Sequence, residues 1–305
     1  MTPMIGIVTV MYNCEKVLDI FFQSLSLQSY KQFILYIIDN QSPDKALIRS
    51  KQLASTCGFK TVIIENGQND GVARGNNIGI QKALDDGCDM VLLSNNDIMI
   101  EPDAIEALLD GLNMHGSSMA VPKIYYYGTT RFWAAGGYFN KWTGLNQHTG
   151  DGQIDIGQYN VARSISYAAT CFMLIRKEVF EHVGLMDEHY FVYWDDVDFV
   201  YKALKKGETL WYIPTSLVHH NESTSTGFMS DFSVRYLYRN LVYFALKNYS
   251  LPYAAYVLLL NIGYHTMVLA FKWPFNKWEL SMKAYKEGFD LYRSLKKGLR
   301  KDFLI

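Results

Sequence analysis

The chain has 305 residues, which is enough for one large α/β domain with an appendage. Its 49% hydrophobic and 15% aromatic residues provide a substantial core and exclude an intrinsically disordered chain. The net charge of −1 does not favour binding to nucleic acid, and we expect no nucleic-acid partner.

The cysteines and the first residues indicate a compartment. The four cysteines lie far apart and form no metal-binding spacing, which is typical of free thiols in a reducing environment. The apolar run at residues 5–11 is short and no basic region precedes it, so it does not resemble a signal peptide. We therefore predict a cytoplasmic protein.

The first half of the chain alternates strand-like and helix-like patterns, which predicts an α/β fold with a doubly wound, mostly parallel sheet. The expected strands are Ile5–Val10, Phe33–Ile38, Thr61–Ile64 and Met90–Leu93. The expected helices are Val17–Leu27, Ala46–Ser55, Asn76–Leu84 and Ala104–Leu112. Each strand leads into a polar segment. Since ligands bind beyond the carboxyl ends of the strands in open α/β sheets, these segments should line one crevice.

The second half begins with a different texture. Residues 119–152 are rich in aromatic residues and glycines, which predicts short irregular strands and a long loop. A strand is expected at Ala168–Ile175, a helix from near Asp196, and a strand at Leu210–Ile213 that ends at Pro214. From Asp231 onward the pattern predicts helices.

Four segments together carry a family resemblance. They read IVTVMYN from Ile7, IIDNQS from Ile37, NDGVARGNNIG from Asn69, and FVYWDDVDFVYKALKKG from Phe191. In this order and spacing they resemble family 2 glycosyltransferases of the GT-A fold, and most closely the non-processive branch that contains bacterial rhamnosyltransferases. The resemblance extends over residues 5–227.

The resemblance implies a domain organisation. A GT-A glycosyltransferase domain would cover residues 1–230, with a Rossmann-like nucleotide-sugar half over about 1–118 and an acceptor half over about 119–230. Residues 231–305 would form a C-terminal helical extension. The QxxRW motif of processive synthases is missing from the sequence, which favours transfer of a single sugar.

The donor would bind at the first strand ends. By resemblance, Tyr12 and the adjacent backbone of Val10 and Asn13 flank the base, and Asp39 binds the pyrimidine or the ribose. A carboxylate at a strand end accepts hydrogen bonds from imide N–H groups or sugar hydroxyls. The alternatives are an Asx-turn for Asp39 and simple core packing for Tyr12.

The glycine-rich run would lie near the diphosphate. Gly71, Gly75 and Gly79 permit close backbone approach, and Arg74 supplies a cation. No P-loop motif is present and no GxGxxG follows the first strand, so two common phosphate-binding motifs are disfavoured. Asn77 is expected to tie this loop to neighbouring strands.

The segment Ser94-Asn95-Asn96-Asp97 occupies the position of the metal-binding DxD motif, with Asn95 in place of the first aspartate. Asn95 and Asn96 are expected to contact the nucleotide-sugar. Asp97, with His219 as partner, is expected to bind Mg²⁺ or Mn²⁺, which would stabilise the departing nucleotide. The alternatives are that Asn95 and Asp97 cap the turn before a helix at Pro102, and that His219 is structural, with His220 as second candidate ligand.

The base is expected at the start of the acidic helix. An inverting transferase needs one carboxylate to deprotonate the acceptor hydroxyl, and by position this is Asp196. The neighbouring carboxylate of Asp195 could raise its pKa. The alternative is a helix-capping cluster, in which Asp198 would cap first. The acceptor side is expected to contain Trp133, Gly136, Gly137, Trp194 and Asp195.

The C-terminal segment suggests a membrane surface. Residues 251–271 contain no charged residue, and residues 272–305 carry nine Lys or Arg against four Asp or Glu, a net charge of +5. An aromatic stripe at helical spacing, which includes Trp278 and Tyr285, lies among these basic residues. This pattern favours interfacial membrane attachment. A packed helical subdomain or homodimer contact, and a transmembrane span, are the alternatives.

The most favoured function is an inverting, metal-dependent transfer of one sugar from a nucleotide-diphosphate donor to a glycan or lipid-linked glycan in cell-surface polysaccharide synthesis, such as that of an O-antigen. By resemblance the first candidate donor is dTDP-rhamnose, followed by a UDP-sugar. The alternatives are a sugar-nucleotide pyrophosphorylase and a non-catalytic nucleotide-sugar-binding protein. A pyrophosphorylase normally has a basic glycine-rich loop after the first strand, and Met11-Tyr12-Asn13-Cys14 lacks one.

Overall fold

The computed structural model describes residues 2–221, 230–272 and 275–302, with side chains described outside 268–276 and 299–302. The chain forms two compact units. The first comprises residues 1–139, 146–191 and 195–225, and the second comprises residues 140–145, 192–194 and 226–305. The boundary predicted near residue 230 does not place residues 140–145 and 192–194 with the C-terminal part, where the structure has them.

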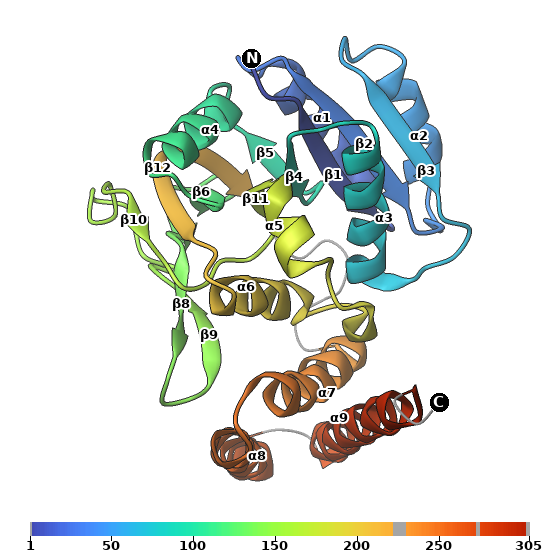
Figure 1. Cartoon of the computed structure of the whole chain (residues 1–305), viewed down its shortest axis with the longest axis vertical. Coiled ribbons are helices and arrows are strands. Elements are labelled where there is room, and N and C mark those ends of the chain that lie inside the picture. Colours follow the sequence, from blue (N-terminus) through green and yellow to red (C-terminus); the bar gives the residue numbers. More distant parts are fainter. Residues whose placement is uncertain (1, 222–229, 273–274, 303–305) are drawn as a thin grey trace. The chain divides into compact units, whose positions relative to one another are not determined.

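A ten-stranded mixed sheet forms the centre of the first unit, in the order β10-β12-β6-β11-β4-β1-β2-β3, with β5 paired to β12 and β7 to β6 (Figure 1). The strands are β1 (Ile5–Met11), β2 (Phe33–Asp39), β3 (Thr61–Glu65), β4 (Met90–Ser94), β5 (Ile98–Ile100), β6 (Met119–Tyr126), β7 (Phe132–Ala134), β10 (Arg163–Ser164), β11 (Phe172–Arg176) and β12 (Leu210–His220). A separate two-stranded sheet contains β8 (Gly137–Asn140) and β9 (Leu145–His148).

The nucleotide half of the sheet is parallel, since β1 pairs in parallel with β2 and β4, and β2 with β3. β11 then lies antiparallel to both β4 and β6, and β12 lies parallel to β6. The predicted α/β fold of GT-A type is confirmed. The antiparallel strand β11 joins the two halves.

Helices cover both faces of the sheet because alternate strand residues point to opposite sides. Ile5 and Ile7 belong to a core with α1 (Leu18–Ser26), α2 (Ala46–Ala54) and α4 (Ala104–Met114). Val8 belongs to a second core on the other face. The helices of that face are α3 (Gly71–Asp85), α5 (Lys177–Val183) and α6 (Asp195–Lys205). This is the double winding that the alternating sequence pattern predicted.

Several predicted boundaries are wrong. The strand expected from Ala168 begins at Phe172. The strand expected to end at Pro214 continues to His220, because the proline lies in an irregularity between Ile213 and Leu217, where the ladder is interrupted. The helix expected from Asn76 starts five residues earlier, at Gly71.

The second unit contains the helices α7 (Asp231–Asn248), α8 (Leu251–Lys272) and α9 (Phe275–Asp302), which pack on one another (Figure 1). The predicted C-terminal helices are thus confirmed. The aromatic stripe of α9 is part of this packing: Tyr285 is 3% exposed, and its hydroxyl lies 2.6 Å from Nδ1 of His265 on α8. Tyr285 therefore lies in the interior of the unit, whereas Trp278 of the same stripe is partly exposed.

Within this unit, residues 140–145 are held through their backbone carbonyls. The hydroxyls of Tyr249, Tyr253 and Tyr256 donate to the carbonyl oxygens of residues 144, 141 and 142, at 2.7–2.9 Å. Asn261 Nδ2 donates to that of residue 143 at 3.0 Å. This segment is therefore fixed by four side chains that follow one another along the chain.

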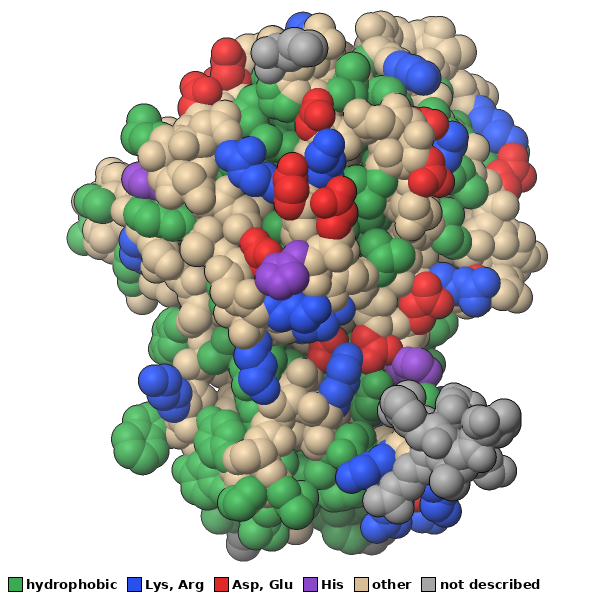
Figure 2. All heavy atoms as spheres, viewed as in Figure 1, with side chains coloured by type: hydrophobic (Ala, Val, Ile, Leu, Met, Phe, Trp, Pro, Cys, Tyr) green, Lys and Arg blue, Asp and Glu red, His purple; other side chains and the backbone are tan. Residues whose placement is uncertain are grey.

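The exposed apolar surface of the unit lies on α8. Leu251 and Leu259 are about three-quarters exposed, and Tyr264 and Met267 more than half. Figure 2 shows apolar side chains gathered at this end of the unit. Among the helices described, none is both long enough and apolar enough for a membrane span.

Candidate active site

Unusual backbone conformations mark the segments that the sequence analysis selected. Among the described residues, the non-glycine residues with positive φ are Asn13, Gln41, Phe191, Tyr193 and Trp194. All of them belong to three of the four segments that carry the family resemblance. Such strained conformations cluster at functional sites, because elsewhere they only cost stability.

The end of β1 presents Tyr12 to solvent, with 44% of the residue exposed. The alternative of core packing for Tyr12 is therefore wrong. At the end of β2, Asp39 is 3% exposed and its Oδ1 accepts from the backbone N–H of Ser42 at 3.1 Å. This hydrogen bond comes from three residues further along the chain, whereas the Asx-turn considered for Asp39 would use the residue two further on. A nucleotide contact would have to use the remaining acceptor capacity of the carboxylate.

Asparagine side chains connect the ends of β2 and β3 to the start of α3. Asn40 Nδ2 donates to the Gly71 carbonyl at 2.9 Å, and Asn66 Nδ2 donates to Asn40 Oδ1 and to Asp70 Oδ2, each at 3.0 Å. The sequence indicated that polar segments follow the strands, but not that their asparagine side chains connect the strand ends to α3. The network fixes the glycine-rich segment relative to the strand ends.

The glycines of α3 permit close contact with protein rather than only with a ligand. A Cβ at Gly71, where φ is +84°, would lie 2.2 Å from the Phe191 carbonyl oxygen. A Cβ at Gly75 would lie 2.8 Å from the Val10 methyls, and one at Gly79 would lie 2.4 Å from Val8. The glycine spacing is therefore explained by the packing of α3 on β1 and on the segment before α6.

The neighbours of these glycines also have structural partners. Arg74 is half exposed, with Nε 3.3 Å from Asp70 Oδ2. Asn77 is buried and holds the Met186 backbone at both its N–H and its carbonyl. The predicted structural role of Asn77 is thus directed at the segment before α6 and not at neighbouring strands.

The end of β4 contains the predicted donor residues Asn95 and Asn96. Asn96 is 8% exposed and donates from Nδ2 to the Val10 carbonyl at 2.9 Å, which ties β4 to β1. The side chain of Asn95 is exposed, and its backbone N–H donates to the Cys171 carbonyl at 2.8 Å. β5 lies between these residues and α4, so the turn that Asn95 and Asp97 were expected to cap leads into a short strand and not directly into the helix.

His220, and not His219, contacts Asp97. His220 Nε2 lies 3.2 Å from Asp97 Oδ1, yet neither atom is aligned for a hydrogen bond, so both remain buried without a partner. His219 Nε2 instead lies 3.1 Å from Glu101 Oε1. Consecutive residues of a strand point to opposite faces, which is why only one of the two histidines reaches the carboxylate.

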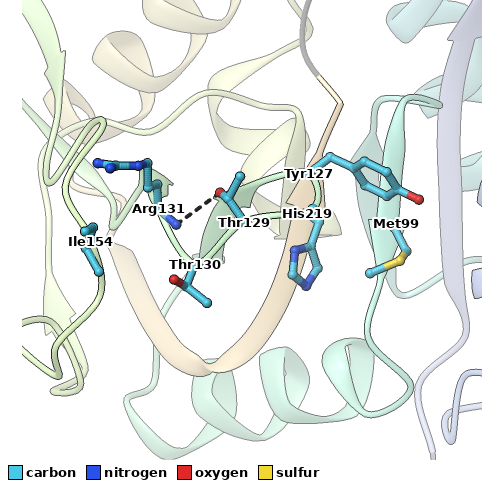
Figure 3. A pocket seen from close by; sticks show the side chains of 8 residues that line it. Met99, Tyr127, Thr129, Thr130, Arg131, Ile154 and His219 are labelled. Carbon is cyan, nitrogen blue, oxygen red and sulfur yellow. Dashed lines mark hydrogen bonds between the residues drawn. The ribbon is translucent and has the colours of Figure 1, made fainter.

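His219 lines a cavity of about 720 Å³. Figure 3 shows its ring beside Met99 and Tyr127, with the turn of Thr129–Arg131 and Ile154 completing the wall. Within the part of the chain that the structure describes, no group of three or more acidic, histidine or cysteine side chains could hold a metal. The described residues near Asp97 that could act as ligands are therefore one carboxylate and one imidazole.

A row of rings leads from His220 to the acidic helix. The Trp133 ring lies 4.7 Å from that of His220 and 4.4 Å from that of His148, and the His148 ring lies 5.6 Å from that of Tyr167. The hydroxyl of Tyr167 donates to Asp196 Oδ2 at 3.2 Å. The sequence analysis selected Trp133 but neither His148 nor Tyr167, because no motif surrounds them.

Within this row, His148 is uncharged at neutral pH. Burial is the main reason that the pKa of His148 falls to about 4, so its imidazole stays neutral. Gly136 and Gly137 make the tight packing possible: a Cβ at Gly137 would lie 2.5 Å from the Gln147 carbonyl oxygen, and one at Gly136 would lie 2.8 Å from Ile165. The observed role of the two glycines is therefore to permit close packing of the residues around this row of rings.

The acidic helix begins with two adjacent carboxyls, of which Asp195 is buried and Asp196 is partly exposed. Asp195 is 4% exposed, and burial together with the charge of Asp196 raises its pKa to about 8. Burial also raises the pKa of Asp196, against hydrogen bonds from the Val197 N–H and Tyr167. Asp198 is fully buried and accepts from the Tyr190 hydroxyl at 3.0 Å, a partner that capping alone would not require.

The predicted carboxylates gather around two buried thiols. Burial is the main cause that raises the pKa of Cys14 to about 12, and the charges of Asp39 and Asp97 contribute. Burial likewise raises the pKa of Cys171, and the charges of Asp97 and Asp196 contribute. The structure thus brings the three predicted carboxylates into one region of the first unit.

Trp194 belongs to the second unit, where its ring lies 5.1 Å from that of Phe244. In the same unit, Asn240 Nδ2 donates to the carbonyl oxygens of Val192 and Tyr193 at 2.8 and 2.9 Å. Asn240 thus stabilises the strained turn that directly precedes Asp195 in the chain. The sequence analysis did not identify Asn240.

The arrangement of the sheet is that of GT-A glycosyltransferases. The crystal structure of GalNAc-T7 with UDP, GalNAc and Mn²⁺ has a similar fold, with a TM-score of 0.66 and 15% sequence identity. The match covers 94% of this chain and 56% of the GalNAc-T7 chain. The family model for glycosyl transferase family 2 matches residues 6–184, and the chain belongs to this family. It is therefore a glycosyltransferase, as the motif resemblance predicted.

Two relatives by sequence have described donors or acceptors. The N-acetylglucosaminyl-diphospho-decaprenol L-rhamnosyltransferase of Mycobacterium tuberculosis is 26% identical over 257 residues, which cover 74% of this chain and 79% of the relative. The dTDP-rhamnosyl transferase RfbF of Shigella flexneri is 27% identical over 167 residues, which cover 53% of this chain and 52% of the relative. The similarity agrees with the rhamnosyltransferase-like branch indicated by the motifs.

Proposed function

We propose that this glycosyltransferase moves one sugar from a nucleotide-diphosphate donor to an acceptor hydroxyl with inversion, and that Asp196 is the base. The observation that carries the proposal is the Asp195–Asp196 pair, in which Asp195 is buried, Asp196 is partly exposed, and only Asp196 receives a tyrosine hydrogen bond. Desolvation raises the pKa of both carboxyls. A carboxylate with a raised pKa accepts a proton more readily, which suits general-base catalysis near neutral pH. The acceptor hydroxyl proton would pass to Asp196 as the oxygen attacks the anomeric carbon and the nucleotide departs.

Asp97 and His220 are the residues that would hold Mg²⁺ or Mn²⁺. The fit rests on two buried polar atoms, Asp97 Oδ1 and His220 Nε2, that have no hydrogen-bond partner. A carboxylate oxygen and an imidazole nitrogen are acceptable ligands, and Mg²⁺ retains waters and phosphate oxygens in place of further protein ligands. The ion would neutralise charge on the diphosphate that leaves. This replaces His219, the first choice from sequence, by its neighbour.

The donor proposal is dTDP-rhamnose, with a UDP-sugar as second choice. It is supported by the names of the M. tuberculosis and S. flexneri relatives, both of which transfer rhamnose. Tyr12 would flank the base, Asp39 would bind the pyrimidine or ribose, and Arg74 would lie near the diphosphate. The remaining donor contacts proposed are with Val10, Asn13, Gly71, Asn95 and Asn96.

The acceptor proposal is a glycan carried on a lipid at the cytoplasmic side of a membrane. The exposed apolar side chains of α8 and the exposed basic side chains of α9, which include Lys286, Arg293, Lys296 and Lys297, support contact with an anionic lipid surface. Trp133, Trp194 and Asp195 would lie on the acceptor side.

The donor proposal is tested by thermal unfolding with nucleotides. At a hundredfold excess over the dissociation constant, a ligand stabilises the folded state by about 2.7 kcal/mol. We expect dTDP or UDP with Mg²⁺ to raise the unfolding temperature more than ADP does, and sugar transfer from the matching nucleotide-sugar to invert the anomeric configuration. Equal shifts with ADP contradict the base assignment, a retained configuration contradicts the single displacement, and pyrophosphate exchange with a nucleoside triphosphate favours a pyrophosphorylase.

The membrane proposal is tested by co-sedimentation with vesicles of anionic and of neutral phospholipid. We expect binding to anionic vesicles that is weakened when Leu259 and Met267 on α8 are both replaced by Ser. The matched control replaces Tyr12 by Ser, an exposed aromatic residue of the other unit. Unchanged sedimentation with a loss of dimer would instead identify the α8 face as a contact between two copies.

A further inference from the structure

Tyr167 reaches the candidate base from a distant part of the chain. Its hydroxyl donates to Asp196 Oδ2 at 3.2 Å across a sequence separation of 29 residues. Tyr167 lies between β10 and β11 and is 2% exposed. The bond is therefore a tertiary contact within the first unit and not part of the local structure of α6.

The ring of Tyr167 is held on several sides. Its backbone N–H donates to the Gly137 carbonyl at 3.2 Å, and a Cβ at Gly137 would lie 2.9 Å from its Cδ1. The rings of Phe139 and His148 lie 5.7 and 5.6 Å away. Since the ring has little freedom to rotate, its hydroxyl fixes the orientation of the carboxylate that it contacts.

The carboxylate of Asp196 retains capacity for a substrate. Its Oδ1 accepts from the Val197 N–H at 2.7 Å, and its Oδ2 accepts from Tyr167. Each carboxylate oxygen offers two lone pairs, so each can accept one further hydrogen bond. An acceptor hydroxyl can therefore be received while Tyr167 stays in place.

The surroundings favour charge on Asp196 rather than on its neighbour. Burial raises the pKa of both carboxyls, and the charges of Asp196 and Asp198 add to the increase at Asp195. Only Asp196 has the hydrogen bond from Tyr167, which lowers its pKa. Burial raises the pKa of the Tyr167 phenol well above its ordinary value, so the phenol keeps its proton and remains a donor. The other titratable groups nearby, Cys171 and His148, are neutral.

We propose that Tyr167 is a positioning residue that keeps Asp196 ionised and oriented toward the acceptor hydroxyl, while Asp195 retains its proton. This inference rests on the proposed role of Asp196 as base. It gives the two adjacent carboxyls of α6 different tasks, with a side chain from the segment between β10 and β11 deciding which of them carries the charge.

The test compares Tyr167→Phe with Tyr190→Phe in the full-length protein. Tyr190 is also buried and donates to a carboxylate of the same helix, Asp198, but not to the base. We expect Tyr167→Phe to lower kcat about tenfold or more, because a hydrogen bond to a charged group is lost. The acid limb of the kcat–pH profile should move to higher pH by about one unit, because the ionised base is no longer stabilised. Tyr190→Phe should lower the unfolding temperature without moving that limb.

The outcomes separate this inference from the proposed function. If the wild-type protein transfers no sugar, the proposed function fails before Tyr167 is considered. If wild type is active and Tyr167→Phe keeps its kcat and its acid limb, or loses only thermal stability as Tyr190→Phe does, the positioning role is overturned. Should Tyr167→Phe not fold, 2,3-difluorotyrosine at position 167 tests the same bond. Its more acidic phenol should move the acid limb to lower pH, and an unmoved limb also overturns the role.

Discussion

Tyr12 and Arg74 at the proposed nucleotide end are about half exposed, whereas the carboxyl of Asp195 on the proposed acceptor side is almost completely buried. The nucleotide end consists of strand ends and the turns that follow them, fixed by asparagine side chains and by the glycines of α3. The acceptor side is assembled from a tyrosine, a histidine and a tryptophan that are far apart in the sequence. The first region therefore depends on local backbone geometry. The second depends on tertiary packing, which controls the ionisation of the carboxyls of Asp195 and Asp196.

The largest effect on the rate of transfer is expected at Asp196, the proposed base. Asp196→Asn keeps the shape of the side chain but removes its ability to accept a proton, so transfer should fall by about 10²–10⁴. Donor binding, measured by calorimetry, should stay within a few-fold of wild type. Asp198→Asn is the control, because it changes a buried carboxylate of the same helix that bonds Tyr190. Parallel losses of turnover and stability in both variants would contradict a catalytic role for Asp196.

The two adjacent histidines provide the next test. His220→Ala should raise the Mg²⁺ concentration required for half-maximal transfer about 10–100-fold, since it removes the imidazole beside Asp97. His219→Ala should leave this concentration almost unchanged, because its ring faces Glu101 and the cavity. A titration of activity with Mg²⁺ distinguishes them, and the reverse result would restore the ligand first chosen from sequence.

The packing of the nucleotide end can be tested with one methyl group. Gly79→Ala places a Cβ 2.4 Å from Val8, so we expect the free energy of unfolding to fall by about 1–3 kcal/mol. Gly263→Ala on α8 meets no atom within 4 Å and should be neutral or stabilising by up to about 1 kcal/mol. Thermal unfolding of both variants gives the comparison, and an equal response would mean that close packing does not explain the glycine spacing.

Another prediction concerns the dependence of stability on pH. The pKa of Asp195 rises from 3.8 to about 8 in the folded protein, so between these values the folded state binds a proton that the unfolded state has released. Stability contributed by this group is therefore lost as the pH rises from about 4 to 8. Asp195→Asn should flatten that part of the curve of unfolding temperature against pH, and an unchanged slope would show that Asp195 is ionised when folded.

The nucleotide end could be predicted from sequence because its elements are short and local. The strand patterns located β1 to β4, and the motif resemblance located Tyr12, Asp39, Asp97 and Asp196. The sequence favoured His219 as the partner of Asp97, whereas His220 lies beside it, because the side that a residue faces depends on the register of β12 beyond Pro214. Tyr167 and Asn240 were missed, since each acts on a segment far away in the sequence and no local pattern records such a contact.

The four side chains that hold residues 140–145 all donate to main-chain oxygens. Every residue type has a main-chain oxygen, so these four hydrogen bonds do not depend on the side chains of the residues that accept them. Trp142, which is 80% exposed, contributes nothing but its carbonyl to these four bonds. Position 144 is restricted, because a Cβ there would lie 2.4 Å from Val257. Asn140 is also used, since its Oδ1 accepts from the backbone N–H groups of Trp142 and Thr143 at 2.9 and 3.3 Å. Evolution can thus exchange the exposed side chain at position 142 while the backbone path of the loop between β8 and β9 stays constant.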